Sequence, residues 1–179
     1  MEYSKLSFFV ILLIAYSSFT EGCTDFPNGT DTKLHWFYTD DLSLNVTNLK
    51  LSAVDGSSNY PLDFSKSYKI DITIENFGKE ATELELDTYI SQWTSQSDCM
   101  WLLLPTYNII KTNNLCGNGT TCPLKVGSQK VSLSIDLAKY STVMSLLKPD
   151  AAYKFMFYIY STKTTHFIDL VLQLRGGKP

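Results

Sequence analysis

The chain has 179 residues, of which 44% are hydrophobic and 13% aromatic, and its formal net charge is −3 at pH 7. A slightly acidic chain creates no field that would attract nucleic acid or an anionic membrane, so we expect neither as a partner. This length can bury a sizeable core, and we predict one domain, at residues 23–179.

Residues 1–22 have the features of a secretory signal peptide. Lys5 precedes an apolar run from Leu6 to Ala15, and the small residues Ser17 and Ser18 follow. The run is too short to span a bilayer, and no later segment has the length and apolarity of a membrane-spanning helix. We therefore expect a chain that is not membrane-spanning and is secreted or delivered to the lysosomal lumen. A lipid-modified Cys23 is the alternative interpretation of the same segment.

Three acceptor sequences for N-glycosylation agree with the secretory route. They begin at Asn28, Asn45 and Asn118, each followed two residues later by threonine. Such sequences occur by chance, but three of them behind a signal peptide predict surface positions in a secreted glycoprotein.

The first half of this domain alternates between apolar and polar residues, as β-strands do. Residues 34–38 are rich in aromatics, and residues 42–53 alternate with a change of phase between Val46 and Leu49. This change predicts a bulge, or a break into two strands. Residues 55–61 are a loop. Residues 68–75 and 84–90 alternate most clearly, and we predict that they pair as an antiparallel hairpin with one wet face.

The second half continues the pattern. Residues 99–104 are continuously apolar and end at Pro105, residues 131–137 alternate, and residues 140–147 suit a short helical turn. Residues 153–160 are apolar on both faces, residues 167–174 alternate again, and residues 176–179 are expected to fray. Strand-like runs separated by turns, without a long periodic helix, predict an all-β fold, an immunoglobulin-like two-sheet antiparallel β-sandwich.

The segment from Leu115 to Leu124 is a turn closed by two cysteines. Cys116 and Cys122 enclose five short residues, two of them glycine. A zinc half-site is the alternative, but zinc thiolates are usually spaced more closely and need further Cys or His partners. We predict a disulfide here, worth roughly 2.4 kcal/mol in the chain-entropy model.

The other two cysteines are Cys23 and Cys99. Four cysteines allow three pairings, and Cys23–Cys99 is the pair that remains once Cys116 and Cys122 are joined. This bond would close a long loop and contribute ~4–5 kcal/mol in the same model. Two free or intermolecular thiols are the alternative, which an oxidising compartment disfavours.

The segment from Asn114 to Gly127, followed by the alternating residues 131–137, resembles the ML (lipid-recognition) family. Members include a lysosomal ganglioside activator and the Niemann–Pick type C luminal sterol carrier. The family typically shows a cysteine a few residues before Cys-Pro, then a Lys-x-Gly-like turn and a strand. Residues 153–158 and 168–176 are similar to its last two strands.

This resemblance implies a small β-sandwich that holds a lipid between its sheets. In much of the family, the first mature cysteine pairs with a cysteine that enters the last strand. That place is taken here by His166 or Phe167, so Cys23 needs a different partner.

The resemblance therefore implies a monomeric lipid-binding or transfer protein, holding a sterol, fatty acyl chain or glycolipid in an apolar cavity. The alternative is a lipid-presenting co-receptor or hydrolase-activator subunit, with a membrane receptor or a lysosomal hydrolase as partner. The pattern of apolar residues alone favours a dense core.

Candidate lipid-binding residues are those on the apolar strand faces, with two tyrosines proposed for the mouth. The lining set is Ile70, Ile72, Ile74, Leu84, Leu86, Trp101, Leu103, Leu133, Ile135, Phe155, Phe157 and Leu170, and the mouth set is Tyr107 and Tyr140.

A hydrolase is the competing class of function. It would need a nucleophile, a base and an orienting acid. His35 and His166 are the only two histidines, and neither lies in a nucleophile motif. The acids Glu83, Glu85 and Asp87 alternate along a strand, which indicates a solvated face. We therefore expect no enzyme, no cofactor and no metal site.

Overall fold

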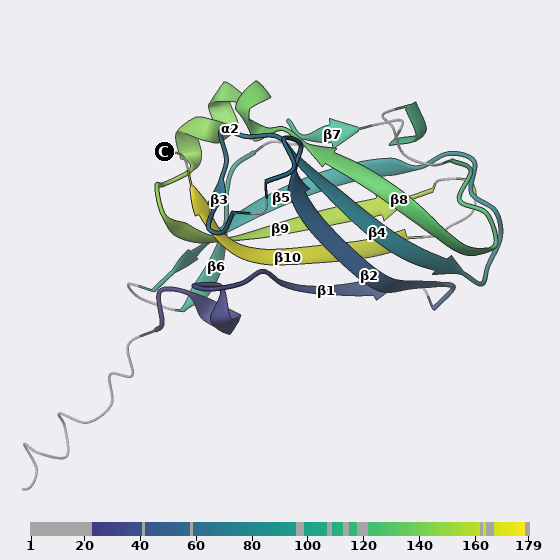
Figure 1. The fold of residues 1–179 in the computed structure, drawn as a ribbon, viewed down its shortest axis with the longest axis horizontal. Helices are drawn as coiled ribbons and strands as arrows, with labels where there is room; N and C mark the ends of the chain where they lie inside the picture. Colours follow the sequence, from purple (N-terminus) through teal and green to yellow (C-terminus); the bar gives the residue numbers. More distant parts are fainter. Residues whose placement is uncertain are drawn as a thin grey trace, which may run out of the picture.

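The computed structural model describes residues 23–40, 42–57, 59–95, 99–106, 109–112, 115–117, 122–161, 163 and 167–177. The predicted signal peptide, acceptor Asn118, mouth residue Tyr107 and His166 lie outside the described residues. Two β-sheets pack face to face (Figure 1), so the predicted two-sheet antiparallel sandwich is confirmed. No helix among the described residues is long and apolar enough to cross a membrane.

The larger sheet has seven strands. Five follow the order β1 (His35–Asp40), β10 (Phe167–Gly177), β9 (Ala151–Tyr160), β5 (Glu85–Thr94) and β6 (Met100–Leu103). Two short strands complete the sheet: β3 (Leu62–Asp63) pairs with β10, and β7 (Lys111–Thr112) pairs with β5. The β3–β10 pair is parallel and the other pairs are antiparallel.

The smaller sheet has three strands, β2 (Leu44–Ala53), β4 (Tyr68–Asn76) and β8 (Gly127–Ile135), with β4 in the middle. The register of β2 against β4 shifts between Val46 and Asn48. This irregularity accounts for the phase change in the sequence, because one extra residue returns the following side chains to the buried face.

The predicted hairpin between residues 68–75 and 84–90 is wrong. These residues form β4 and β5, which belong to different sheets: β4 pairs with β2 and β8, whereas β5 pairs with β9, β6 and β7. Each strand does have one buried face, as the alternation indicated. The connection crosses from one layer to the other instead of turning within a sheet.

Helical structure among the described residues is confined to short segments. These are η1 (Pro27–Gly29), η2 (Leu115–Gly117), η3 (Leu137–Lys139) and α2 (Ser141–Leu146). The helical turn predicted for residues 140–147 is confirmed as α2. Figure 1 shows α2 and β7 on the side of the sandwich opposite to β1.

The core lies between the two inner faces. Ile70, Ile72 and Ile74 of β4 are almost completely buried, as are Phe157 of β9 and Leu170 of β10 on the facing sheet. The rings of Phe64, Tyr153 and Phe155 pack edge to face at one end, with centroids 5.2 and 5.7 Å from Phe64. Such ring packing stabilises a core beyond the area it buries.

One of the two disulfides joins distant parts of the chain, and the other closes a short loop. Cys23 is bonded to Cys99 and Cys116 to Cys122, with Cα–Cα distances of 5.4 and 5.3 Å. The first bond attaches the N-terminal segment to β6, and the indole Nε1 of Trp93 donates a hydrogen bond to the Thr24 carbonyl at 2.8 Å.

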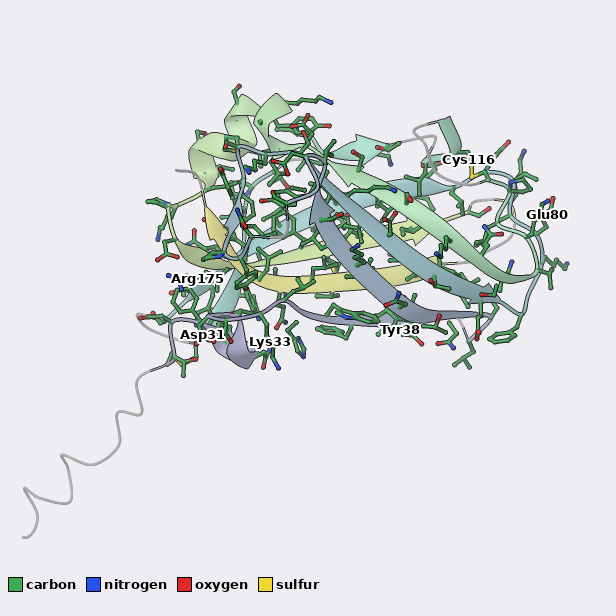
Figure 2. All side chains as sticks on the ribbon, viewed as in Figure 1. Asp31, Lys33, Tyr38, Glu80, Cys116 and Arg175 are labelled. Atoms are coloured by element: carbon green, nitrogen blue, oxygen red, sulfur yellow. A yellow bond between two sulfur atoms is a disulfide. The ribbon has the colours of Figure 1, made fainter. Side chains whose placement is uncertain are left out.

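β10 includes Gly176 and Gly177, which corrects the expectation that these two residues fray; residues 178 and 179 lie outside the described residues. The carbonyl of Gly177 accepts a hydrogen bond from Phe64 N at 2.8 Å. A Cβ at Gly177 would lie 2.5 Å from the backbone nitrogen of Asp150, so only glycine permits this approach. Nearby, the Arg175 guanidinium donates to both carboxylate oxygens of Asp150 and contacts the Asp31 carbonyl at 3.5 Å (Figure 2).

Candidate functional site

A cavity of about 460 Å³ lies between the two sheets, where β5 and β7 of the larger sheet face β8 of the smaller one. Segments η2 and η3 complete its wall. The cavity is lined by Leu86, Thr88, Ile110, Thr112, Leu115, Leu133, Ser134, Ile135, Asp136, Leu137, Lys139, Tyr140 and Phe157.

The topology accounts for the position of this space. β8 is an edge strand of the smaller sheet, and β7 adds only two residues to the larger sheet on the same side. Neither sheet therefore closes fully on the other here, and short helical segments form the boundary instead of a paired strand. The Cys116–Cys122 disulfide anchors η2, and the Leu115 amide donates to the Leu84 carbonyl at 2.8 Å.

The floor of the cavity is made of buried side chains. Leu86, Leu115, Leu133, Leu137 and Phe157 are all buried, and they are aliphatic or aromatic. These five side chains make the floor of the cavity apolar. An apolar ligand group placed against them would leave water at a gain of about 25 cal/mol per Å².

One member of the floor is polar. The side chain of Thr88 is 3% exposed, and its Oγ1 has no hydrogen-bond partner among the described residues. Its backbone N–H donates to the Ile110 carbonyl at 3.2 Å, so only the hydroxyl is left unsatisfied. A buried hydroxyl without a partner costs about 1–3 kcal/mol, which makes this position exceptional in the core.

The rim is polar and more exposed. Ser134 and Lys139 are exposed, and Asp136 is half-buried. The Lys139 ammonium lies 3.1 Å from Asp136 Oδ2. Burial acts to raise the pKa of the Asp136 carboxyl, but hydrogen bonds from Lys139 and Ser67 outweigh it, and the pKa lies below its usual value. Asp136 is therefore ionised at neutral pH, and the rim carries a charge of each sign.

Three further spaces lined by described residues are smaller. Spaces of about 20 Å³ beside Phe64 and about 10 Å³ beside Leu84 have room for one water at most. A space of about 110 Å³ beside Leu34 and Tyr60 lies on the side of β2. The large cavity is thus the one of these that has the volume of a ligand site.

The structure brings five of the predicted lining and mouth residues to this cavity: Leu86, Leu133, Ile135, Tyr140 and Phe157. Six others, Ile70, Ile72, Ile74, Leu84, Phe155 and Leu170, are buried but do not line it. They belong to the filled part of the core, because both sheets cover them.

Trp101 and Leu103 lie elsewhere, which corrects their placement on an inner face. Trp101 is paired with Trp93 and Leu103 with Ser91, on the face of β5 opposite to Leu86 and Ile90. Leu103 is 59% exposed, and the Lys154 ammonium lies 5.6 Å from the Trp101 ring centroid. The run from Cys99 to Leu104 is apolar on both faces, so alternation could not show which face is inner.

Apart from Tyr140, the polar members and the loop members of the lining were not predicted from the sequence. Thr88 had a recognisable signal: it stands in phase with Leu84, Leu86 and Ile90, a polar residue in an otherwise apolar register. The residues contributed by turns and short helices carry no period, so nothing in the sequence placed them here. They are Ile110, Thr112, Leu115, Asp136 and Lys139, whereas Leu137 continues the alternation of Leu133 and Ile135.

Of the groups considered for a hydrolase, those that the structure describes, His35, Glu83, Glu85 and Asp87, do not line the cavity. His35 belongs to β1, on the opposite side of the sandwich from β7, and its ring packs near Phe37 at 5.9 Å. Glu85 and Asp87 lie on the outer face of β5, where Lys111 Nζ is 3.3 Å from Asp87 Oδ1. Within the described ranges, no group of three or more His, Cys, Asp or Glu residues could hold a metal ion.

The predicted glycosylation acceptors differ in their surroundings. Asn28 is exposed in η1, with its side-chain amide donating to Gln173 Oε1 at 2.5 Å. Asn45 is half-buried, accepts a hydrogen bond from the Tyr38 hydroxyl and donates to Glu75 Oε2 at 3.3 Å. Both amides thus form contacts that an attached glycan would have to replace.

No protein-family model matches the chain, and no curated protein matches its sequence. Solved structures match its fold. The C-terminal domain of wzt aligns with 84% of this chain and 82% of its own, with 11% identity and a TM-score of 0.51. A Niemann-Pick type C2 protein from the Japanese carpenter ant aligns with 78% of this chain and 98% of its own, with 11% identity and a TM-score of 0.47.

Proposed function

We propose that this protein binds a lipid in the cavity between β5, β7 and β8 and carries it without catalysing a reaction. The observation that carries the proposal is a space of about 460 Å³ with an apolar floor and a charged, polar rim. A lipid has the complementary form, because its hydrocarbon part seeks a dry surface and its head group seeks water.

The volume favours one hydrocarbon chain. An engineered cavity of about 150 Å³ holds benzene, which has six non-hydrogen atoms. A space of about 460 Å³ is about three times larger and so accommodates on the order of 18 such atoms. This volume matches a single acyl chain, whereas a sterol or a two-chain glycolipid has more non-hydrogen atoms than the space would hold.

The sequence supports the same proposal independently of the cavity. The Cys-Pro segment and the last two strands resemble the lipid-recognition family, and the N-terminal segment resembles a secretory signal peptide. Two disulfides suit an oxidising compartment. We therefore place lipid binding outside the cell or in the lysosomal lumen, with a monomer as the binding unit.

A binding experiment with matched variants tests the proposal. Full-length protein is expressed in a secretory host, delipidated and titrated with a fluorescent fatty acid. Ile110→Trp places a large ring in the cavity and is expected to weaken binding about tenfold or more, because it removes the volume that the chain would occupy. Ile109→Trp is the control, since Ile109 is already 38% exposed and does not line the cavity.

Absence of binding to the folded parent protein would refute the proposal. Equal binding by both tryptophan variants would show that the probe lies elsewhere. A pull-down with lipid-loaded and delipidated protein then separates a free carrier from a lipid-presenting subunit, since only the latter would retain a receptor or hydrolase when loaded.

A further inference from the structure

Three exposed apolar side chains lie at one end of the smaller sheet, in three different loops. They are Leu42, before β2, Phe77, after β4, and Val126, before β8, with exposed fractions of 91%, 68% and 64%. Single exposed apolar residues are common on protein surfaces, whereas a group of them at one place marks a contact site. We call these three residues the apolar tip.

The strand register places the three loops side by side. Asn76 of β4 pairs with Leu44 of β2 and with Gly127 of β8, and the tip residues lie one or two positions beyond these three. The backbone N–H of Phe77 donates to the Ser43 carbonyl at 2.8 Å, which joins two of the loops directly. The tip therefore belongs to the end of the sandwich where β4 ends and β8 begins (Figure 1).

The backbone beneath the tip is held by further hydrogen bonds. The amides and carbonyls of Ala81 and Leu124 bond reciprocally at 3.0 and 2.8 Å, and the Asn76 side-chain amide donates to the Leu124 carbonyl at 3.2 Å. The Leu115 amide, at the cavity floor, donates to the Leu84 carbonyl in the same β4–β5 connection. The tip is thus carried by loops that are fixed to each other and to the η2 wall of the cavity.

Leu42 has a backbone conformation that leucine does not favour. Its φ is 68°, in the left-handed region, where glycine and asparagine are accommodated more readily. Its side chain buries little within the molecule, so core packing does not compensate for this strain. Strained residues are concentrated at functional sites. Leucine at this position therefore points to a contact that its side chain makes outside the chain.

A lipid bilayer suits the tip better than a folded partner does. A stable protein interface takes about 20–30 residues from each side, whereas the tip offers three side chains on separate loops. A bilayer instead takes up apolar side chains singly, and the affinity grows with the apolar area that enters it. Three side chains at one end of a sandwich can enter a bilayer together without any larger complementary surface.

The charge around the tip indicates an electrically neutral bilayer. Four acidic residues and two lysines lie within three positions of the tip in the sequence: Asp40, Asp41, Glu75 and Glu80, against Lys79 and Lys125. An excess of acids is repelled by anionic lipids, so the attraction has to come from the apolar side chains. Zwitterionic lipids such as phosphatidylcholine impose no such repulsion.

We propose that Leu42, Phe77 and Val126 insert into the surface of a zwitterionic lipid bilayer and dock this end of the protein on a membrane. The choice of a bilayer rests on the proposed lipid-carrying function, because a carrier exchanges its ligand with membranes. Docking in this orientation places the β4–β5 connection, which supports η2, against the membrane and next to the wall of the cavity.

The experiment is sedimentation of the full chain with sucrose-loaded phosphatidylcholine vesicles. Glycans are first trimmed with an endoglycosidase, because the acceptor Asn45 lies in β2 near the tip. Val126→Asp is expected to weaken partitioning about fivefold or more, since it removes an apolar side chain from the bilayer and adds a charge that remains in water. Val54→Asp is the matched control and should partition as the parent does. Val54 is 65% exposed, but it lies at the opposite end of the same sheet, where Ala53 pairs with Tyr68.

Leu42→Asn separates docking from folding. Asparagine adopts the left-handed conformation more readily than leucine, so this variant should be at least as stable as the parent in thermal unfolding. It should nevertheless partition about fivefold more weakly. Combining it with Phe77→Asp and Val126→Asp should weaken partitioning about hundredfold, since the three side chains enter the bilayer separately. Partitioning of the parent should not fall between about 0.1 and 1 M salt, because it does not depend on charge.

The outcomes separate this proposal from the carrier function. If the parent does not sediment with the vesicles, or if Val126→Asp and Leu42→Asn partition as Val54→Asp does, the proposal is overturned, and fatty-acid binding in solution still decides the carrier function. Binding that requires anionic lipid also overturns it, as does a parent dimer that light scattering shows to be monomeric in Leu42→Asn. If the tip binds vesicles but the protein binds no fatty acid, the carrier function falls and the docking surface stands.

Discussion

The buried hydroxyl of Thr88 lowers the free energy of unfolding, unlike the hydrocarbon side chains next to it in β5. Its hydroxyl is buried without a partner among the described residues, and its side chain lies in register with Leu86 and Ile90, which bury only hydrocarbon. A group of this kind stabilises neither the core nor the sheet.

Thr88→Val is expected to raise the free energy of unfolding of the delipidated protein by about 1 kcal/mol, because it removes an unsatisfied buried hydroxyl without creating a cavity. Urea denaturation followed by tryptophan fluorescence measures the change. Thr88→Ser, which keeps the hydroxyl and deletes a methyl group, should instead lower the stability. A destabilised Thr88→Val variant would mean that the hydroxyl already has a partner in the unliganded protein.

Because Tyr153 is buried, we expect the free energy of unfolding to depend on pH in the alkaline range. The residue is 0% exposed, and burial raises the pKa of its phenol from the usual 10.0 to about 12, although a backbone hydrogen bond from Lys148 acts in the opposite direction. Because the folded pKa exceeds the unfolded one, the contribution is fully present below pH ~10 and is lost as the pH rises toward ~12.

The loss at Tyr153 amounts to roughly 2–3 kcal/mol. Tyr153→Phe should be less stable than the parent at pH 8, since it loses the hydrogen bonds with Lys148, and the two proteins should converge as the pH approaches 11. Urea midpoints at the two pH values measure this. A constant difference between the proteins would refute the assignment.

At the scale of the element, η2 connects the disulfide to the cavity. Cys116 follows Leu115, which forms part of the floor, and its bond to Cys122 keeps this short helix against β5. The Cys23–Cys99 bond holds the N-terminal segment to β6, whose residues do not line the cavity. The two disulfides therefore allow a matched comparison. Removal of either should lower the free energy of unfolding, but only removal of Cys116–Cys122 should weaken lipid binding.

Replacing Cys116 and Cys122 by alanine should cost about 2.4 kcal/mol, and replacing Cys23 and Cys99 about 4.5 kcal/mol, because the sequence separations are 6 and 76. Lipid affinity should fall in the first double variant and remain unchanged in the second, measured at a temperature where both are folded. The reverse order of affinities would show that η2 is not a wall of the site.

The elements themselves were largely predictable, but their partners were not. Alternation identified β4, β5 and β8, and the phase change located the irregularity in β2, since burial of one face is a local property of sequence. Pairing joins residues far apart in the chain, so the hairpin predicted for β4 and β5 was wrong. The same limit applies to the site: most of its strand residues were predicted, whereas Leu115 of η2 and Lys139 of η3 lie outside any alternating run.

For the whole molecule, the position of the cavity makes the sandwich asymmetric. One side has β7 and β8 at an incompletely closed boundary, and the opposite side has β1 paired along its length with β10. A side that lacks continuous strand pairing opens more readily, since fewer backbone hydrogen bonds must break. If the protein carries a lipid as proposed, we expect η2, η3 and β7 to move when the chain enters, while β1, β10 and β9 remain in place.

Lipid binding should consequently protect one side of the sandwich more than the other. At a free ligand concentration of about 100 times the dissociation constant, the folded state gains about 2.7 kcal/mol, which raises the unfolding temperature. Hydrogen exchange followed by mass spectrometry should show slower exchange in peptides covering 109–112, 115–117 and 133–140. Peptides from β1 should change only through global stabilisation. Equal protection of both sides would place the ligand away from this cavity, because no local contact would then distinguish β7 and η3 from β1.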